Sequence, residues 1–144
     1  MINLPVTLTG YIVHGKHLGT HFGMPTANID PVEDVSDLAH GVYFSVITVD
    51  QKQYAAITNL GTRPTVSNDG RVNAETFICG YDGDLYGKEA KITLLLFHRP
   101  EKRFSSADEL FRTISEDIIA GAKYHHFPED ELPKALTSSS IASV

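Results

Sequence analysis

The sequence contains one cysteine, no apolar run long enough to span a membrane, and no excess of basic residues. A single cysteine, Cys79, excludes a disulfide bond within the chain. A membrane span would need roughly 18 consecutive apolar residues, which the chain does not contain. The N-terminal segment Met1–Pro5 lacks the basic and apolar regions of a secretory signal. These absences predict a cytoplasmic protein.

Acidic residues outnumber basic ones, and the formal net charge is −6 at pH 7. Nucleic acids and anionic membrane surfaces are themselves negatively charged, so the charge balance disfavours both as main partners. The oligomeric state stays open, with a monomer slightly favoured.

Short runs rich in β-branched and aromatic residues make up most of the chain. Their length and composition favour strands over helices. We expect strands at residues 7–13, 41–49, 53–59, 72–79 and 86–97, with turns at 50–52, 68–70 and 82–83. Strands joined by hairpins at this spacing predict a small antiparallel barrel rather than a parallel sheet with alternating helices.

One of these runs, residues 72–79, alternates between two faces. One face has Val72, Ala74, Thr76 and Ile78, and the other has Glu75, Phe77 and Cys79. Cys79 is most simply a small core residue. A carboxylate within a strand, such as Glu75, is usually solvated or ion-paired. The functional alternative is a general base aimed at a substrate hydroxyl.

A helix is indicated from residue 106 to about residue 123. Ser106-Ala107-Asp108-Glu109 fits a capping box, in which the serine hydroxyl and the glutamate side chain satisfy free backbone amides. Leu110, Ile114 and Ile118 then form one apolar stripe, which docking on the barrel is enough to explain. Gly121 is expected to weaken the end of the helix. Residues 128–144 lose this periodicity and predict a disordered tail.

Three glycines spaced by four residues, Gly15, Gly19 and Gly23, follow the first expected strand. Such a loop can curl its amides around an anion, but a flexible surface loop explains the spacing equally well. The segment is neither a Walker A loop nor a GxGxxG turn. It also contains three histidines, His14, His17 and His21. The glycines between them argue against a helix that would align them for zinc.

Thr26 and Asn28 lie two residues apart, so in an extended segment their side chains point to the same side. A hydroxyl and an amide oxygen are hard, neutral ligands that suit Mg²⁺. A local turn before Pro31 is the simpler explanation on these residues alone. Further along, the segment 99–104 places cations beside an aromatic ring, which suits a planar or anionic ligand or else a solvated connector. Without further context, these residues do not establish phosphoryl transfer.

Together, these segments resemble the riboflavin kinase (flavokinase) family, including the kinase domain of bacterial bifunctional riboflavin kinase/FAD synthetase. The resemblance covers about residues 9–122. Seven motifs occur in family order: Gly10-x-x-x-His14-Gly15, Gly23-Met24-Pro25-Thr26-Ala27-Asn28, Gly41-Val42-Tyr43, Asn59-Leu60-Gly61-Thr62-Arg63-Pro64-Thr65, Ala74-Glu75-Thr76, Gly83-Asp84-Leu85-Tyr86-Gly87-Lys88 and Arg99-Pro100-Glu101-Lys102-Arg103-Phe104.

The resemblance implies a mainly β fold, a six-stranded antiparallel Greek-key barrel with a C-terminal α-helix, over residues 1–127. It implies that the chain phosphorylates riboflavin at its 5′-hydroxyl with Mg-ATP, giving FMN and ADP, with riboflavin and ATP as its small-molecule partners. Glu75 is then the catalytic base, and Thr26 and Asn28 hold Mg²⁺. The residues implied to bind ATP and its phosphates are Gly15, Lys16, Gly19, His21, Gly23, Pro25, Thr26, Asn28 and Tyr86. Those implied on the flavin side are Arg99, Lys102 and Phe104.

The sequence departs from the family pattern at one position. Many bacterial members have a basic residue where this chain has Thr20, and Lys16 or His21 could supply the missing charge. No adenylyltransferase segment precedes the kinase-like region, so the chain alone is expected to stop at FMN. The alternatives are a non-catalytic flavin-binding regulatory module and an interaction domain that docks through the helix.

Overall fold

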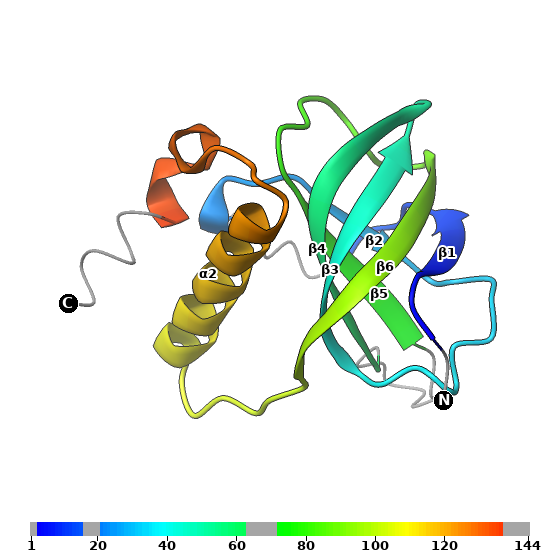
Figure 1. Ribbon diagram of the computed structural model, residues 1–144, viewed down its shortest axis with the longest axis horizontal. Coiled ribbons are helices and arrows are strands. Elements are labelled where there is room, and N and C mark those ends of the chain that lie inside the picture. Colours follow the sequence, from blue (N-terminus) through cyan, green and yellow to red (C-terminus); the bar gives the residue numbers. More distant parts are fainter. Residues whose placement is uncertain (1–2, 16–20, 63–71, 137–144) are drawn as a thin grey trace.

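The computed structural model describes residues 3–15, 21–62 and 72–136. Six antiparallel strands form one curled sheet in the order β1-β6-β3-β4-β5-β2, and a single long helix packs against its outer face (Figure 1). The elements are β1 (Val6–Tyr11), β2 (Thr26–Ile29), β3 (Gly41–Val49), β4 (Lys52–Thr62), β5 (Val72–Ile78), β6 (Glu89–Pro100), α2 (Ala107–Tyr124) and the 3₁₀ turn η1 (Glu129–Glu131).

The sheet curls so that its two edge strands, β1 and β2, approach each other. Just after β1, the backbone amide of Val13 donates to the carbonyl of Asn28 in β2 at 2.8 Å. On the other side of β2, the amide of Val32 donates to the carbonyl of Thr9 at 3.0 Å. The expected six-stranded antiparallel Greek-key barrel with a C-terminal helix is confirmed. The turn expected at residues 68–70 lies outside the described residues.

Two apolar cores lie on opposite faces of this sheet, because strand side chains alternate between faces. The barrel interior holds Leu8, Ile29, Tyr43, Ile47, Ala74, Ile78, Ile92 and their neighbours. The second core lies between the outer face and α2 and contains Phe44, Ile57, Phe77, Cys79, Ile114 and Ile118. The alternation expected along β5 is therefore observed, and burial raises the pKa of the Cys79 thiol to about 11.

Helix α2 begins where the capping residues predict. The hydroxyl of Ser106 accepts a hydrogen bond from the Glu109 amide at 3.1 Å. The Glu109 carboxylate reaches one residue further back than a standard capping box, and it accepts from the amide and hydroxyl of Ser105. Ile114 and Ile118 are buried against the barrel, so the helix stripe is already covered within the chain. This burial argues against a docking helix that exposes its stripe to a partner.

Gly121 lies in the last turn of α2, but the helix does not end there. The helix continues to Tyr124, and Gly121 is buried where α2 crosses β4. A β-carbon at Gly121 would overlap Cγ1 of Ile57 and lie 2.9 Å from Cδ1 of Ile57. The glycine is therefore explained by close helix–sheet packing.

The expected disordered tail needs correction for residues 128–136. This segment forms η1 and places Leu132 and Leu136 in the second core. Leu136 is 0% exposed, and burying a leucine side chain contributes about 1.5–3 kcal/mol, which offsets the cost of ordering a short segment. Figure 1 shows this segment, drawn in red-orange, beside the light-blue segment that leads into β2. Residues 137–144 lie outside the described residues.

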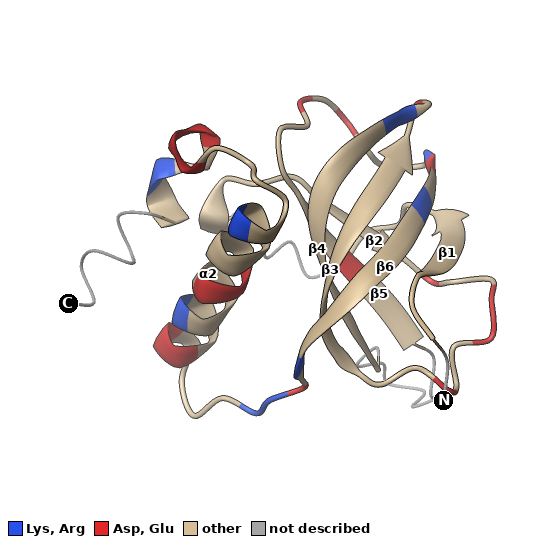
Figure 2. Ribbon diagram, viewed as in Figure 1, with Lys and Arg blue, Asp and Glu red and all other residues tan. Residues whose placement is uncertain are grey.

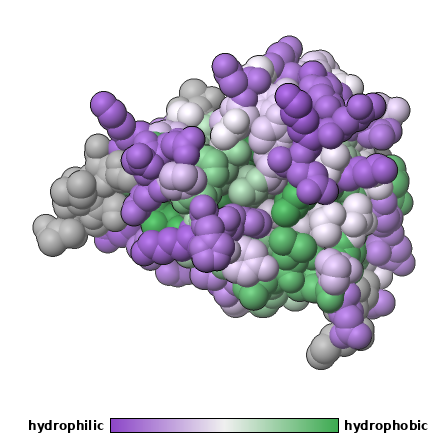
Figure 3. All heavy atoms as spheres, turned by 45° about the horizontal axis from the view of Figure 1, so that its top comes forward, coloured by the Kyte–Doolittle hydropathy of each residue, from purple (hydrophilic) through white to green (hydrophobic). Residues whose placement is uncertain are grey.

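Polar side chains cover much of the face of the molecule shown in Figure 3, and several charged residues occur along α2 (Figure 2). Apolar surface also reaches the outside in places between polar side chains (Figure 3). The large hydrophobic residues that remain exposed include Leu96, Phe97 and Tyr124. Within the described part of the chain, no helix is long and apolar enough to cross a bilayer.

Candidate active site

A row of cross-strand partners runs over five neighbouring strands on the outer face of the sheet. From β6 to β2, its members are Arg99, Val42, Asn59, Glu75 and Asn28. Residues directly opposite each other on paired strands project to the same face, with Cβ atoms about 4.5–5.5 Å apart. The antiparallel register therefore brings one carboxylate between two amides, from strands far apart in the sequence.

Glu75 lies in the middle of β5, directly opposite Asn28 on β2. Both side chains are buried, with 5% of each residue exposed. Thr26 lies two residues before Asn28 on the same strand, opposite Phe77, so its hydroxyl faces the same side as the Asn28 amide. The three residues that the sequence indicated separately thus form one cluster.

Gly15 packs directly against Asn28. A β-carbon at position 15 would overlap the side-chain amide of Asn28. The loop backbone therefore approaches the Asn28 amide as closely as only glycine permits. The Thr26 hydroxyl and the Asn28 amide oxygen are hard, neutral ligands of the kind that fits Mg²⁺. Within the described part of the chain, no three His, Cys, Asp or Glu side chains converge as an alternative metal site.

A pocket of about 570 Å³ opens on the other side of Glu75, between the sheet, helix α2 and the segment that joins β6 to α2. Its sheet side is formed by Val42, Ile57, Asn59, Glu75 and Phe77. Leu110, Ile114 and Ile118 of α2 form the facing wall, and Phe104 lies with them. The pocket is therefore mostly apolar, with polar groups concentrated near Glu75 and at the rim.

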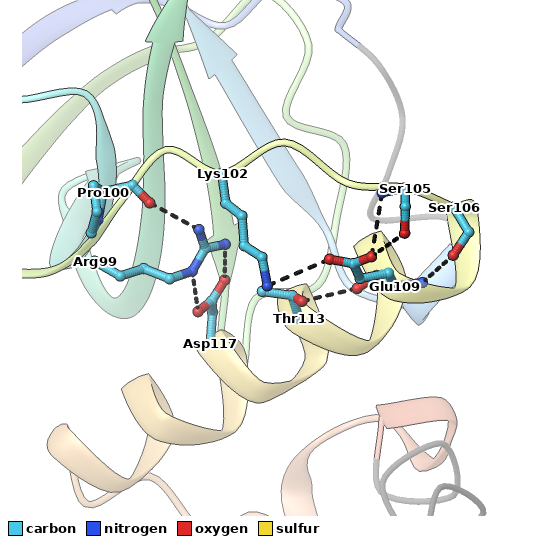
Figure 4. A network of polar contacts seen from close by, with 8 residues as sticks. All are labelled: Arg99, Pro100, Lys102, Ser105, Ser106, Glu109, Thr113 and Asp117. Carbon is cyan, nitrogen blue, oxygen red and sulfur yellow. Dashed lines mark hydrogen bonds and ion pairs between the residues drawn. The ribbon is translucent and has the colours of Figure 1, made fainter.

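The rim is held by an ion pair between β6 and α2, shown in Figure 4. Asp117 accepts two hydrogen bonds from Arg99, at 2.9 Å from Nε and 2.6 Å from Nη2. The Asp117 side chain is 6% exposed, and His98 Nε2 lies 3.6 Å from its Oδ1. Nη1 of Arg99 also donates to the carbonyl of Pro100 at 3.1 Å, so all three guanidinium nitrogens are held and the side chain is fixed in place at the pocket edge.

Lys102 and Phe104 lie in the connection that follows Arg99. Figure 2 shows the basic residues that gather there in blue. Lys102 Nζ is 3.5 Å from the Glu109 carboxylate and 5.7 Å from the centre of the Phe104 ring. The Lys102 side chain is 52% exposed, so this ion pair leaves the ammonium group accessible from the pocket mouth.

The residues expected on the nucleotide side are more dispersed. Tyr86 is 58% exposed and stacks on His14, with ring centres 4.0 Å apart. His21 stacks on Phe111 of α2 at 3.7 Å. Gly23 has a φ of +70°, and the carbonyl of Pro25 accepts from the amide of Ile78 at 3.0 Å. Lys16, Gly19 and Thr20 lie outside the described residues.

A chain of buried hydroxyls lies behind the polar row, inside the barrel. The Thr58 hydroxyl is 2.8 Å from both the Ser45 and the Thr76 hydroxyls, and all three residues are 0% exposed. Thr58 directly precedes Asn59 in the sequence, and Thr76 directly follows Glu75. These hydrogen bonds therefore fix the register that places the amide and the carboxylate side by side.

Two residues of this site received no role from the sequence. Asn59 occurs in a family motif, but only the pairing of β4 with β5 shows that it lies beside Glu75. Asp117 follows the helical stripe by three residues from Ile114, which makes it resemble an ordinary helix-surface acid. Its burial and its partner Arg99, 18 residues earlier, are properties of the folded chain alone.

This fold and site define a class of enzyme domain. The family model described as Flavokinase: Riboflavin kinase matches residues 2–125. The chain belongs to the riboflavin kinase family.

Several relatives support the same assignment. The chain is 34% identical over 116 residues to the RNA-binding riboflavin kinase RibR of Bacillus subtilis, covering 81% of this chain and 50% of that protein. It is 34% identical over 125 residues to the bifunctional riboflavin kinase/FMN adenylyltransferase of Escherichia coli K12, covering 86% and 39%. The chain thus spans half or less of the length of these relatives.

A solved structure supports the fold. The riboflavin kinase of Trypanosoma brucei superposes with a TM-score of 0.61 at 24% identity, covering 85% of this chain and 78% of that one. At this identity, the likeness extends to the barrel-and-helix architecture.

Proposed function

We propose that this domain transfers the γ-phosphoryl group of ATP to the 5′-hydroxyl of riboflavin, giving FMN and ADP. The observation that carries the proposal is the row Asn28, Glu75, Asn59. It places a buried carboxylate between a glycine loop on one side and an apolar pocket on the other. A kinase needs the acceptor hydroxyl in line with the phosphorus and its leaving oxygen, and a base within reach of that hydroxyl.

The pocket suits the flavin acceptor. Its walls are aromatic and aliphatic, which matches a flat ring system, and its volume of about 570 Å³ lies within the range of small-molecule sites. Phe104 and Lys102 lie at the mouth, where a ring and an ammonium group can cover the exposed edge of the flavin. Arg99, fixed by Asp117, shapes this edge. With the ring bound there, the sugar-alcohol chain can extend along the sheet toward Glu75.

The loop side suits the nucleotide phosphates. Thr26 and Asn28 would hold Mg²⁺, which when bound neutralises charge on the phosphates during transfer. Because Gly15 has no β-carbon, the loop backbone lies directly against the Asn28 side chain, beside the proposed phosphate site. We also assign Gly23, Pro25, Tyr86 and His21 to this proposed site, and with them Lys16 and Gly19, which lie outside the described residues.

Glu75 would accept the proton of the 5′-hydroxyl as that oxygen attacks phosphorus. Burial from bulk water keeps the carboxylate aimed at one position and strengthens its interaction with the hydroxyl. Because phosphoryl transfer has a loose transition state, alignment contributes more than the basicity of Glu75.

The test is direct formation of FMN. Purified protein is incubated with riboflavin, ATP and MgCl₂, and the flavins are separated by chromatography. We expect FMN and ADP in equal amounts, and loss of both products when EDTA replaces the metal. Tight binding of riboflavin without turnover would instead support the alternative, a non-catalytic flavin-binding regulatory module.

A further inference from the structure

The two amides beside Glu75 lie in different surroundings. Asn28 is 5% exposed and has the Gly15 backbone against its side chain. Asn59 is exposed and lines the apolar pocket together with Glu75. Glu75 therefore marks a boundary, with one amide on the phosphate side and the other on the acceptor side.

Away from Glu75, the neighbours of Asn59 toward β3 and earlier on β4 are apolar. Val42 lies directly opposite on β3, and Ile57 precedes it by two residues on β4. Both line the same pocket. An exposed amide at this position is the group nearest to Glu75 along the row toward the pocket, at a Cβ separation of about 4.5–5.5 Å.

A side-chain amide can donate and accept at once, which matches an alcohol, because a hydroxyl also does both. Glu75, the base that would receive the proton of one hydroxyl, lies directly opposite Asn59 on the neighbouring strand. A ligand with a row of adjacent hydroxyls would therefore reach both groups together.

We propose that Asn59 is a specificity-determining residue that binds a hydroxyl of the acceptor's polyol chain, next to the hydroxyl that Glu75 deprotonates. This inference rests on the proposed function for the identity of the acceptor. It goes beyond that proposal because it assigns recognition of the polyol chain, and not only of the flavin ring, to Asn59 on β4, the strand beside Glu75.

The test compares two flavins that share a ring but differ in the chain. Riboflavin carries the polyol chain, whereas lumiflavin carries a methyl group in its place. Binding of each to wild type and Asn59→Ala is measured by quenching of flavin fluorescence. We expect riboflavin affinity to fall about 3- to 10-fold, the size of one neutral hydrogen bond, and lumiflavin affinity to stay unchanged. The KM for riboflavin should rise while the KM for ATP stays the same.

The matched control is Gln53→Ala. Gln53 is an exposed amide on the same strand and the same face, six residues or about 20 Å from Asn59. It should change neither affinity. Unchanged riboflavin affinity in Asn59→Ala, or equal losses for both flavins, would overturn the inference. If Asn59→Ala loses affinity for riboflavin but not for lumiflavin, and the wild type makes no FMN, the proposed function fails while recognition of the polyol chain by Asn59 stands.

Discussion

The backbone of Gly15 lies against the side-chain amide of Asn28, closer than any other residue type would allow. Gly15→Ala should therefore displace Asn28 and raise the KM for Mg-ATP, by at least about tenfold for a displacement near 1 Å. Steady-state kinetics with ATP varied at saturating riboflavin measures this.

A double-mutant cycle separates steric displacement from a general loop defect. Since Asn28→Ala removes the atoms that overlap, adding Gly15→Ala to it should cost little more. Full additivity of the two effects would show that Gly15 acts in another way.

Asp117 is predicted to stabilise the domain by holding Arg99. Asp117→Asn leaves the guanidinium with a weaker partner, and we expect a loss of about 2 kcal/mol in the free energy of unfolding, less than for a fully buried pair because Arg99 keeps some exposure. Urea titration provides the measurement. Glu116→Gln removes the same charge from the neighbouring exposed position and should change stability by under about 0.5 kcal/mol. Equal effects of the two variants would refute the ion pair as the cause.

Gly121→Ala should destabilise the protein, although alanine is the better helix former. The gain in helix propensity is at most about 1 kcal/mol, whereas overpacking in a core costs about 1–3 kcal/mol. The overlap is with Ile57, so Ile57→Val should relieve part of it in the double variant. A thermal melt in which Gly121→Ala alone raises Tm would contradict this account of the packing.

Much of the fold could be predicted from local patterns. The run 41–49 coincides with β3, and the cap at Ser106 fixes the start of α2, because both depend on short-range signals. The sequence does not explain Gly121 and predicts the wrong structure for residues 128–136, because the role of each depends on the surface it packs against. A glycine within a helix and a leucine after Pro128 give no local signal of a stable structure. In the folded chain, Gly121 packs against Ile57, and Leu136 is buried in the second core.

The residues of the site likewise fall into those that the sequence predicts and those that it does not. Glu75, Thr26 and Asn28 could be assigned through their resemblance to a family, and the register explains how they meet. Neither Asn59 nor Asp117 could be assigned, because each depends on a partner across the fold. Residue type and spacing do not report a cross-strand neighbour 16 residues away.

His125 makes stability depend on pH. It caps α2, and its ring Nε2 lies 3.3 Å from the carbonyl of Ala56. Burial lowers the pKa of His125 from its ordinary 6.5, against smaller opposing contributions from backbone hydrogen bonds. The unfolded chain therefore binds a proton at a pH where the folded protein does not. The contribution of the neutral His125 ring to the free energy of unfolding is fully present above pH 6.5. It is lost as the pH falls below 6.5 and through the lowered pKa of the folded state.

The comparison of wild type with His125→Gln isolates this contribution. Urea midpoints measured from pH 7.5 to 5 should fall less steeply for the variant than for the wild type. Identical slopes would show that His125 does not contribute to the pH dependence.

The most direct test of the whole account is Glu75→Gln, which keeps the shape of the side chain and removes its ability to take a proton. With Mg-ATP and riboflavin at saturation, kcat should fall at least about a hundredfold, the lower range for a well-placed general base, while FMN binding measured by fluorescence stays near wild type. Turnover at the wild-type rate would contradict the assignment of Glu75 as the base and, with it, the phosphotransfer geometry derived from the row.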